Sequence, residues 1–131
     1  MKPFILNASD TTPHIYFDPD KDKFEFFGES RPENTGAYFE PVFKWIKEYG
    51  SQMNGSGAGK QISLNVQLDY FSSTSAKYIA NMFFLFESLV AKGCIVQVLW
   101  RYRTADLQIR ESGEQFQKIL HIPFVFEKFE D

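Results

Sequence analysis

The chain has 131 residues and a mass of 15.3 kDa, a length that suits one compact domain. Hydrophobic residues make up 44% and charged residues 24%, which excludes a wholly disordered or collagen-like chain. The formal net charge of -3 argues against a nucleic-acid-binding protein, because binding to phosphates depends on clustered cations. Aromatic residues make up 18%, so we expect a large aromatic core with some rings left at the surface.

The single cysteine, Cys94, excludes an internal disulfide and suits a reducing compartment. The apolar run at the N-terminus is too short for a signal sequence, and no apolar run in the chain approaches the ~20 residues of a membrane span. We therefore expect a cytoplasmic protein without membrane insertion.

The first part of the chain predicts a β-hairpin after a loose arm over residues 1–12. Strands are predicted at 14–17 and 23–28, because both stretches are rich in aromatic residues. The segment between them, 18–22, is dense in turn-forming residues and joins the two strands. Its three aspartates and Glu29 imitate a calcium loop, but a lysine stands where such a loop needs glycine, which favours a solvated turn.

An amphipathic helix follows the hairpin. Its apolar spacing predicts a start capped near Asn34 or Thr35 and an end at Gly50. Pro41 falls inside this helix and predicts either a kink or a later start. Residues 51–59 are rich in glycine and predict a flexible surface loop.

The second half of the chain alternates strands with helices. The predicted strands are 61–71, 94–100 and 124–129, and the predicted helices are 76–92 and 104–120. The strand at 94–100 is nearly all apolar, which is typical of a strand covered on both faces. This order indicates an α/β fold in a single domain, 1–131, with a mixed, mostly parallel five-stranded sheet, an N-terminal β-hairpin and three helices.

No standard enzyme site stands out, and we predict neither a catalytic site, a cofactor nor a metal. The segment Gly55–Lys60 resembles a phosphate-binding loop, but its first glycine and its final Ser/Thr are replaced, and a strand follows it. His14 and His121 have no neighbouring metal-ligand pattern. Cys94 opens a predicted buried strand, where cysteine usually acts as a small hydrophobe.

The segment Asp69–Lys77 is the best candidate for a site. It connects a strand to a helix, and sites in open α/β sheets are usually built at that edge. Four hydroxyl residues stand in succession, Ser72 to Ser75. One hydroxyl suffices to cap a helix, and from the residues alone capping is the favoured interpretation. The alternative is that one of them carries a phosphate, whose charge is tolerated at a helix N-terminus and would block an apposed partner.

Several landmarks, in order and spacing, resemble those of the SiaC-type regulatory phosphoproteins of bacteria, whose fold is similar to the STAS domains of anti-sigma-factor antagonists. The resemblance covers the chain from about Phe17 onward. The landmarks are Gly28–Asn34, Trp45 with Tyr49, Tyr70–Lys77, Val98–Tyr102, Glu111–Glu114 and Pro123 with Phe124. The resemblance therefore implies a STAS-like regulatory domain.

In that family the phosphorylated residue is the hydroxyl residue just after an asparagine, which by position is Ser73. Here Ser72 replaces the asparagine and Ser73 replaces a threonine, so a slip of one residue would make Thr74 the acceptor instead. The resemblance implies a Ser/Thr protein kinase, a PP2C-like phosphatase and an effector as partners. In the founding type the effector is a diguanylate cyclase, which implies a role in cyclic di-GMP signalling.

The helix after the hydroxyl segment offers a candidate docking face. Its apolar set Ile79, Met82, Phe83 and Phe86 is expected to pack on the sheet, and the helical face also includes Leu89 and Val90. The expected partner-binding residues are Arg31, Glu33, Asn34, Ser72, Lys77, Tyr78, Phe84 and Leu85. Two alternatives stay open: Asn34 is a simple helix cap, and a neighbouring helix or a homodimer covers Phe84 and Leu85.

Two other function classes compete with the phosphoprotein. A small-molecule-binding or enzymatic α/β domain would use the same strand–helix edge and would need a deep pocket with converging polar groups near Ser72–Ser75. A structural oligomerisation module would bury Phe84 and Leu85 against a second copy.

Overall fold

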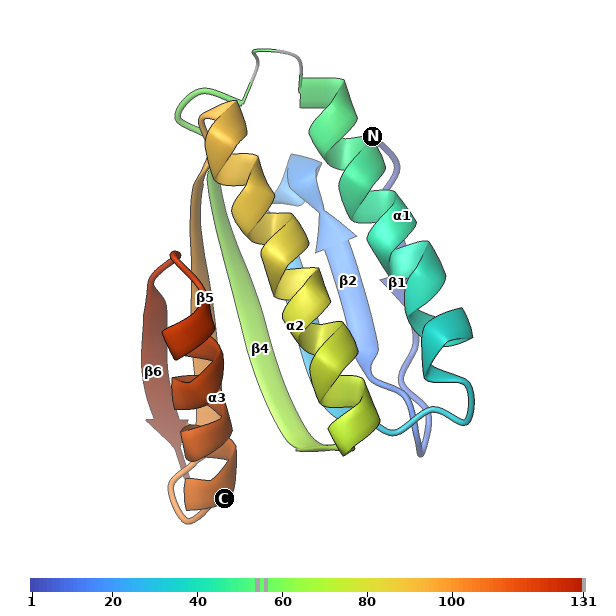
Figure 1. The fold of residues 1–131 in the computed structure, drawn as a ribbon, viewed down its shortest axis with the longest axis vertical. Helices are drawn as coiled ribbons and strands as arrows, with labels where there is room; N and C mark the ends of the chain where they lie inside the picture. Colours follow the sequence, from blue (N-terminus) through green and yellow to red (C-terminus); the bar gives the residue numbers. More distant parts are fainter. Residues whose placement is uncertain (54, 56, 131) are drawn as a thin grey trace.

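Among the residues that the structure describes, six strands form one sheet, in which they lie side by side in chain order (Figure 1). The computed structural model describes residues 1–53, 55 and 57–130. The strands are β1 (Phe4–Leu6), β2 (His14–Asp18), β3 (Lys23–Ser30), β4 (Gln61–Phe71), β5 (Ile95–Arg103) and β6 (Phe124–Phe129). The first three pair antiparallel, and β3 to β6 pair parallel. The mixed, mostly parallel sheet with an N-terminal hairpin is therefore confirmed, with six strands instead of five.

Three helices connect the parallel strands: α1 (Thr35–Met53), α2 (Ser73–Glu87) and α3 (Leu107–Ile119). All three lie in front of the sheet in Figure 1, as right-handed crossovers between successive neighbouring strands require. Short 3-10 segments, η1 (Pro19–Lys21) and η2 (Ser88–Lys92), complete the elements. Each helix begins at the edge where the preceding parallel strand ends, so the starts of the three helices gather at one pole of the molecule.

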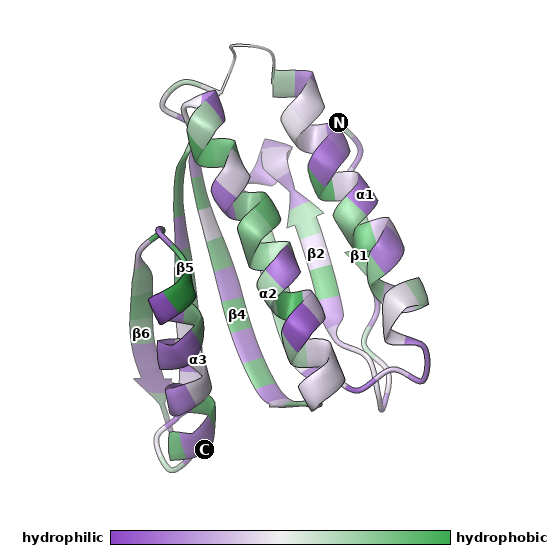
Figure 2. Ribbon diagram, viewed as in Figure 1, coloured by the Kyte–Doolittle hydropathy of each residue, from purple (hydrophilic) through white to green (hydrophobic). Residues whose placement is uncertain are grey.

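Within the described residues, the helices cover one face of the sheet and leave the other face open (Figure 1). Along β4 the side chains alternate between buried apolar residues and more exposed polar residues, which Figure 2 shows as alternating green and purple. β5 follows the same alternation: Val96 and Val98 are buried, whereas Ile95 is 58% exposed. The prediction that this strand is covered on both faces was therefore wrong, because every helix crosses on the same side.

Aromatic rings hold the helices to the sheet. Phe86 of α2 meets Phe17 and Phe24 edge to face, with centroid distances of 5.3 and 5.9 Å. On α3, Phe116 lies 5.7 Å from the ring of Trp100 and 5.2 Å from Phe83 of α2. Such pairs add to the stabilisation from area burial, so the high aromatic content serves mainly the core.

The N-terminal segment differs from its prediction. We expected a loose arm, but Phe4–Leu6 pairs antiparallel with β2 and adds the sixth strand. The reason is tertiary: Phe4 packs against Phe17 and Trp45, and the indole Nε1 of Trp45 donates to the carbonyl of Lys2 at 3.0 Å.

The helix boundaries also differ from those predicted. α1 begins at Thr35 and includes Pro41, which excludes the late start, and it runs past Gly50 to Met53. Residues 54 and 56 of the predicted loop lie outside the described residues. α2 begins at Ser73 instead of Ala76, and the last apolar residue assigned to its buried face, Val90, is 47% exposed in η2. Among the described residues, no helix is both long and apolar enough to span a bilayer.

Candidate functional site

The first turn of α2 is organised by Ser72. This residue follows β4 with extended backbone angles (φ -74°, ψ 162°) and is the N-cap of the helix. Its hydroxyl accepts a hydrogen bond from the backbone N–H of Ser75 at 3.1 Å, and its carbonyl accepts from Ala76 at 2.9 Å. One of the four hydroxyls is thus used for capping, as the residues alone favoured.

Ser75 is sealed inside the molecule. Its side chain is fully buried, and the hydroxyl of Ser30, also fully buried, donates to it at 2.9 Å. The backbone N–H of Ser72 donates to the carbonyl of Ser30 at 2.9 Å. These two bonds tie the end of β3 to the start of α2 and remove Ser75 from contact with solvent.

Ser73 and Thr74 are the two hydroxyl residues of this segment that remain exposed. They occupy the first two positions of α2, where the backbone N–H groups have no partner within the helix and the helix dipole is positive. Lys77 is exposed one turn later, four residues after Ser73 and on the same side of the helix. An anion on either hydroxyl would therefore find favourable charges close by.

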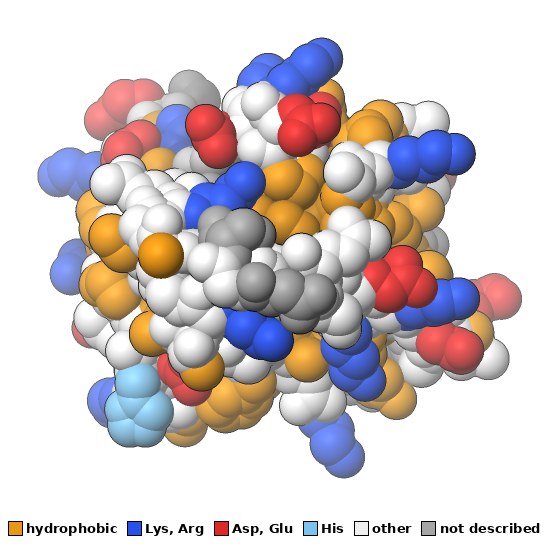
Figure 3. Space-filling view, turned by 90° about the horizontal axis from the view of Figure 1, so that it is seen from above, with side chains coloured by type: hydrophobic (Ala, Val, Ile, Leu, Met, Phe, Trp, Pro, Cys, Tyr) orange, Lys and Arg blue, Asp and Glu red, His pale blue; other side chains and the backbone are white. Residues whose placement is uncertain are grey.

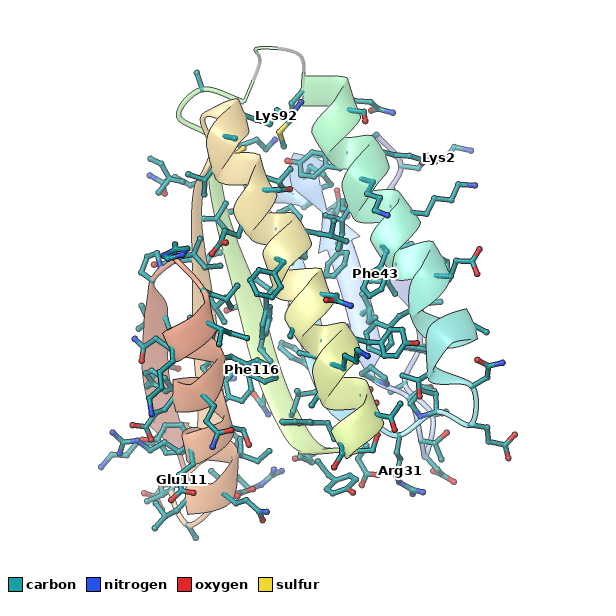
Figure 4. All side chains as sticks on the ribbon, viewed as in Figure 1. Lys2, Arg31, Phe43, Lys92, Glu111 and Phe116 are labelled. Atoms are coloured by element: carbon teal, nitrogen blue, oxygen red, sulfur yellow. The ribbon has the colours of Figure 1, made fainter. Side chains whose placement is uncertain are left out.

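Arg31 lies at the same pole as the start of α2, beneath its first turn in Figure 4. Its Nε donates to Glu29 at 2.9 Å, and this hydrogen-bonded ion pair raises the pKa of the guanidinium. Its backbone N–H donates to the carbonyl of Thr11 at 2.8 Å. Glu33 is exposed nearby, whereas the side chain of Asn34 accepts from Ala37 N–H at 3.0 Å and so acts as a cap of α1.

The docking residues predicted on α2 divide between two sides of the helix. Phe84 is 42% exposed, as expected of the outer face. Tyr78 and Leu85 are half-buried instead of lying on the outer face. Tyr78 stacks on Phe39 and Phe43 of α1, at centroid distances of 5.7 and 6.2 Å. These two residues were misplaced because α1 packs along that side of α2.

A trough of about 350 Å³ separates α2 from α3 and begins at the pole that carries Ser73. Ala76 and Ala80 line its α2 side, and small side chains at these two positions leave the space open. Phe116 and Ile119 line its α3 side, and Ile119 is 51% exposed. Lys77 also lines the trough. The hollow beside the hydroxyl segment is thus an apolar groove, not a pocket with converging polar groups.

The other sequence candidates have structural roles. Asp18 is buried, accepts from the hydroxyl of Tyr16 at 3.1 Å and caps η1 in the hairpin turn. Cys94 is buried, and desolvation raises the pKa of its thiol. His14 pairs with Glu25 across the hairpin at 3.1 Å. Within the described part of the chain, no group of three His, Cys, Asp or Glu side chains is placed to hold a metal ion.

The pole opposite the start of α2 carries side chains of both charges. Figure 3 looks down on it and shows Lys and Arg interspersed with Asp and Glu around small apolar areas. A nucleic-acid surface would need clustered cations. The cations of this pole are interspersed with carboxylates (Figure 3), so they do not form such a cluster.

Comparison with known families identifies the chain. The model of the SiaC family of regulatory phosphoproteins matches residues 6–129, nearly the whole sequence. This chain belongs to the SiaC family.

Solved members share the fold. SiaC of Pseudomonas aeruginosa superposes with a TM-score of 0.83 at 22% identity, covering 98% of this chain and 100% of that one. The SiaC chain in a crystal structure of the diguanylate cyclase SiaD in complex with its activator SiaC, also from P. aeruginosa, gives a TM-score of 0.84 at 22% identity, covering 96% and 99%. An uncharacterized protein of P. aeruginosa strain UCBPP-PA14 is 22% identical over the full length of both chains.

Sequence reasoning missed three parts of this candidate site. Ser30 and its bond to Ser75 join residues far apart in the chain. Ala76 and Ala80 form the wall of the trough, and their spacing of four residues was the one available signal. Phe116 comes from α3, which approaches β5 closely because Gly113 packs against Trp100: a Cβ at residue 113 would lie 2.6 Å from the indole Nε1.

Proposed function

We propose that this chain is a partner-switching regulator without enzymatic activity, reversibly phosphorylated on Ser73 by a Ser/Thr kinase and a PP2C-like phosphatase. The observation that carries the proposal is the sorting of the four hydroxyls: Ser72 caps α2, Ser75 is sealed, and Ser73 and Thr74 face solvent. The family consists of regulatory phosphoproteins. Resemblance to its central motif favours Ser73 over Thr74.

The local charges suit a covalent phosphate at Ser73. A phosphoryl group carries about -1.5 to -2 charges at neutral pH. The positive end of the α2 dipole and the ammonium of Lys77 would stabilise that charge without any rearrangement of the fold. The modification would therefore change the surface, and the fold would stay as it is.

We place the effector in the trough between α2 and α3, together with the exposed Phe84 on the next turn of α2. Aromatic and aliphatic side chains in a hollow are typical anchors of a protein interface. A phosphate on Ser73 would stand at the mouth of this trough. Removing this charge from water in an interface costs several kcal/mol, so we expect the unphosphorylated form to bind at least ~100-fold more tightly.

A diguanylate cyclase is the effector that the family relationship favours, because SiaC of P. aeruginosa forms a complex with the diguanylate cyclase SiaD as its activator. By this likeness, the switch would act in cyclic di-GMP signalling, and we propose that it does so in the cytoplasm. We also propose that the domain is STAS-like, as the resemblance to the family implies.

Phosphate-affinity electrophoresis and peptide mass spectrometry after incubation with the cognate kinase test the site. We expect one phosphate on the wild type and on Thr74→Ala, and none on Ser73→Ala. Modification of Ser73→Ala but not of Thr74→Ala would move the acceptor to Thr74. Unchanged modification of both variants would overturn the site.

Calorimetry with the cyclase tests the docking face. Ala80→Glu places a charge in the trough, and we expect it to weaken binding at least ~10-fold, about 1.4 kcal/mol. Asn81→Glu adds the same charge at the neighbouring, exposed position and is the matched control, with less than a ~3-fold effect. Equal effects of the two substitutions would place the effector elsewhere.

A further inference from the structure

A large hollow on the surface lies along α1. It has a volume of about 680 Å³ and runs between α1 and α2, with the parallel rings of Phe43 and Tyr78 in its lining. Figure 4 shows Phe43 on the side of α1 that faces α2. We call this hollow the α1 groove. Its α1 lining residues are Gly36, Glu40, Phe43, Lys44, Lys47, Glu48 and Ser51.

The charges of the α1 groove are balanced. Glu40, Lys44, Lys47 and Glu48 are all exposed, and none forms a salt bridge within the part of the chain that the structure describes. Two acids and two bases give no preference for an acidic or a basic partner. What distinguishes the groove is the order of its residues along the helix.

That order is self-complementary about a point between Phe43 and Lys44. If a second α1 lies antiparallel across a two-fold axis at this point, Glu40 faces Lys47 of the second copy, and Lys47 faces its Glu40. Gly36 likewise faces Ser51, two small residues that permit close approach at both ends. At the centre, Phe43 faces the stem and ammonium of Lys44, a contact that aromatic rings favour.

From this pattern we infer that the α1 groove binds a second copy of this chain, in a symmetric dimer with two antiparallel α1 helices at its centre. A two-fold interface requires one surface that is complementary to itself, and the stripe along α1 meets that requirement. The α2 helices would flank the pair, so that Tyr78 of each copy contacts the α1 helix of the other. The four helices would then pack as a bundle.

The interface would be small. α1 has 19 residues and is therefore about 27 Å long, and two helices side by side are about 20 Å wide. The area is on the order of 500 Å² per copy, below the ~800 Å² of a standard stable interface. We therefore expect a weak dimer, in equilibrium with monomer at micromolar concentrations. The inference does not depend on phosphorylation of Ser73 or on the effector.

Charge reversal combined with analytical ultracentrifugation tests the dimer on the full chain, from about 10 µM to about 1 mM. Lys47→Glu alone and Glu40→Lys alone each create two like-charged contacts, and we expect each to raise the dimer dissociation constant at least ~10-fold. The double variant Glu40→Lys/Lys47→Glu restores both pairs and should return within ~3-fold of wild type. Lys128→Glu, on β6, is the control and should have no effect.

Both substituted positions are exposed on a helix, and Glu and Lys have similar helix propensities, so circular dichroism and thermal unfolding should match the wild type. A chain that stays monomeric up to about 1 mM overturns the inference. A dimer that the single reversals leave unchanged places self-association on another face. Failure of the double variant to restore the dimer would indicate that the groove receives a different partner.

Discussion

Two tyrosines on α1 differ in how their hydroxyls are satisfied. Tyr49 is only 6% exposed, and its hydroxyl has no hydrogen-bond partner among the described residues. Its ring packs 5.2 Å from Trp45 and lies under the ammonium of Lys60. The hydroxyl of Tyr38, by contrast, donates to the carbonyl of Pro13 at 3.3 Å. Burial raises the pKa of both phenols, so both are neutral at physiological pH.

Removing each hydroxyl should therefore change stability in opposite directions. Tyr49→Phe removes an unpaired buried polar atom, and we expect the free energy of unfolding to rise by about 1 kcal/mol. Tyr38→Phe leaves the carbonyl of Pro13 without its hydrogen-bond donor and should lower the free energy of unfolding by about 1 kcal/mol. Urea unfolding at neutral pH measures both. If Tyr49→Phe lost as much stability as Tyr38→Phe, the hydroxyl of Tyr49 would have to form a hydrogen bond, and the prediction would be wrong.

Among the elements, β1 shows how a short segment is held by distant residues. It is three residues long and forms one edge of the sheet. The ring of Phe4 stacks on Phe17 at a centroid distance of 6.1 Å and packs at a tilt against Trp45 at 6.4 Å, whereas the adjacent Ile5 is 55% exposed. The strand is therefore attached mainly through the inward side chain of Phe4 and the bond from Trp45 to the carbonyl of Lys2.

This arrangement predicts unequal effects of two neighbouring substitutions. Phe4→Ala should lower the free energy of unfolding by about 2 kcal/mol, less than for a fully buried phenylalanine because Phe4 is half-buried. Ile5→Ala is the control and should change it by less than about 0.5 kcal/mol. Trp45 fluorescence should shift to longer wavelength in Phe4→Ala only. Equal effects of the two changes would mean that pairing with β2, and not ring packing, holds the strand.

The sequence predicted the elements that carry their own periodicity and missed those that depend on tertiary contacts. The alternation along β4 and the turn between β2 and β3 were sufficient to place those strands. β1 was missed because three residues carry no period, and its contacts come from Trp45, far along the chain. The start of α2 was placed too late because serine and threonine are poor helix formers in the interior, although they are favoured at its start.

Because the start of α2 was placed too late, the sequence pattern did not show which hydroxyl residues at the site are buried and which are exposed. With the helix starting at Ser73, Ser75 lies four residues before the buried Ile79 and must face the sheet. The helical period then places Ser73 and Lys77 on the exposed side of α2. The positions of Tyr78 and Leu85 required the placement of α1 beside α2, which no local pattern provides. The C-terminal edge of the sheet was predicted as the site because parallel strands end there, and that inference needed only the order of elements.

At the scale of the whole molecule, the candidate site rests on the centre of the sheet. β4 has β3 on one side and β5 on the other, and its buried face carries Ile62, Leu64, Val66 and Leu68. The edges are weaker: β1 is short, and β6 is joined only to β5. On the open face, Arg101 pairs with Glu127 at 3.1 Å and lies over the ring of Phe129, which attaches β6 through side chains as well as the backbone.

Native-state hydrogen exchange should reproduce this gradient. We expect the amides of β4 between Leu64 and Leu68 to exchange most slowly, through global unfolding, because both neighbouring strands must separate first. The amides of β1 should exchange fastest among the strands, and β6 should be intermediate. Arg101→Ala removes the ion pair, the ring contact and a side-chain hydrogen bond to Gln67 of β4. It should speed exchange in β6 by about 3-fold to 10-fold, while the amides of β4, which are held by backbone bonds on both sides, keep the rate set by global unfolding.

The amides of Ser73 and Thr74 should exchange within the dead time, because they have no partner within the helix and both residues are exposed. Protection of these two amides comparable to that of β4 would contradict an accessible acceptor.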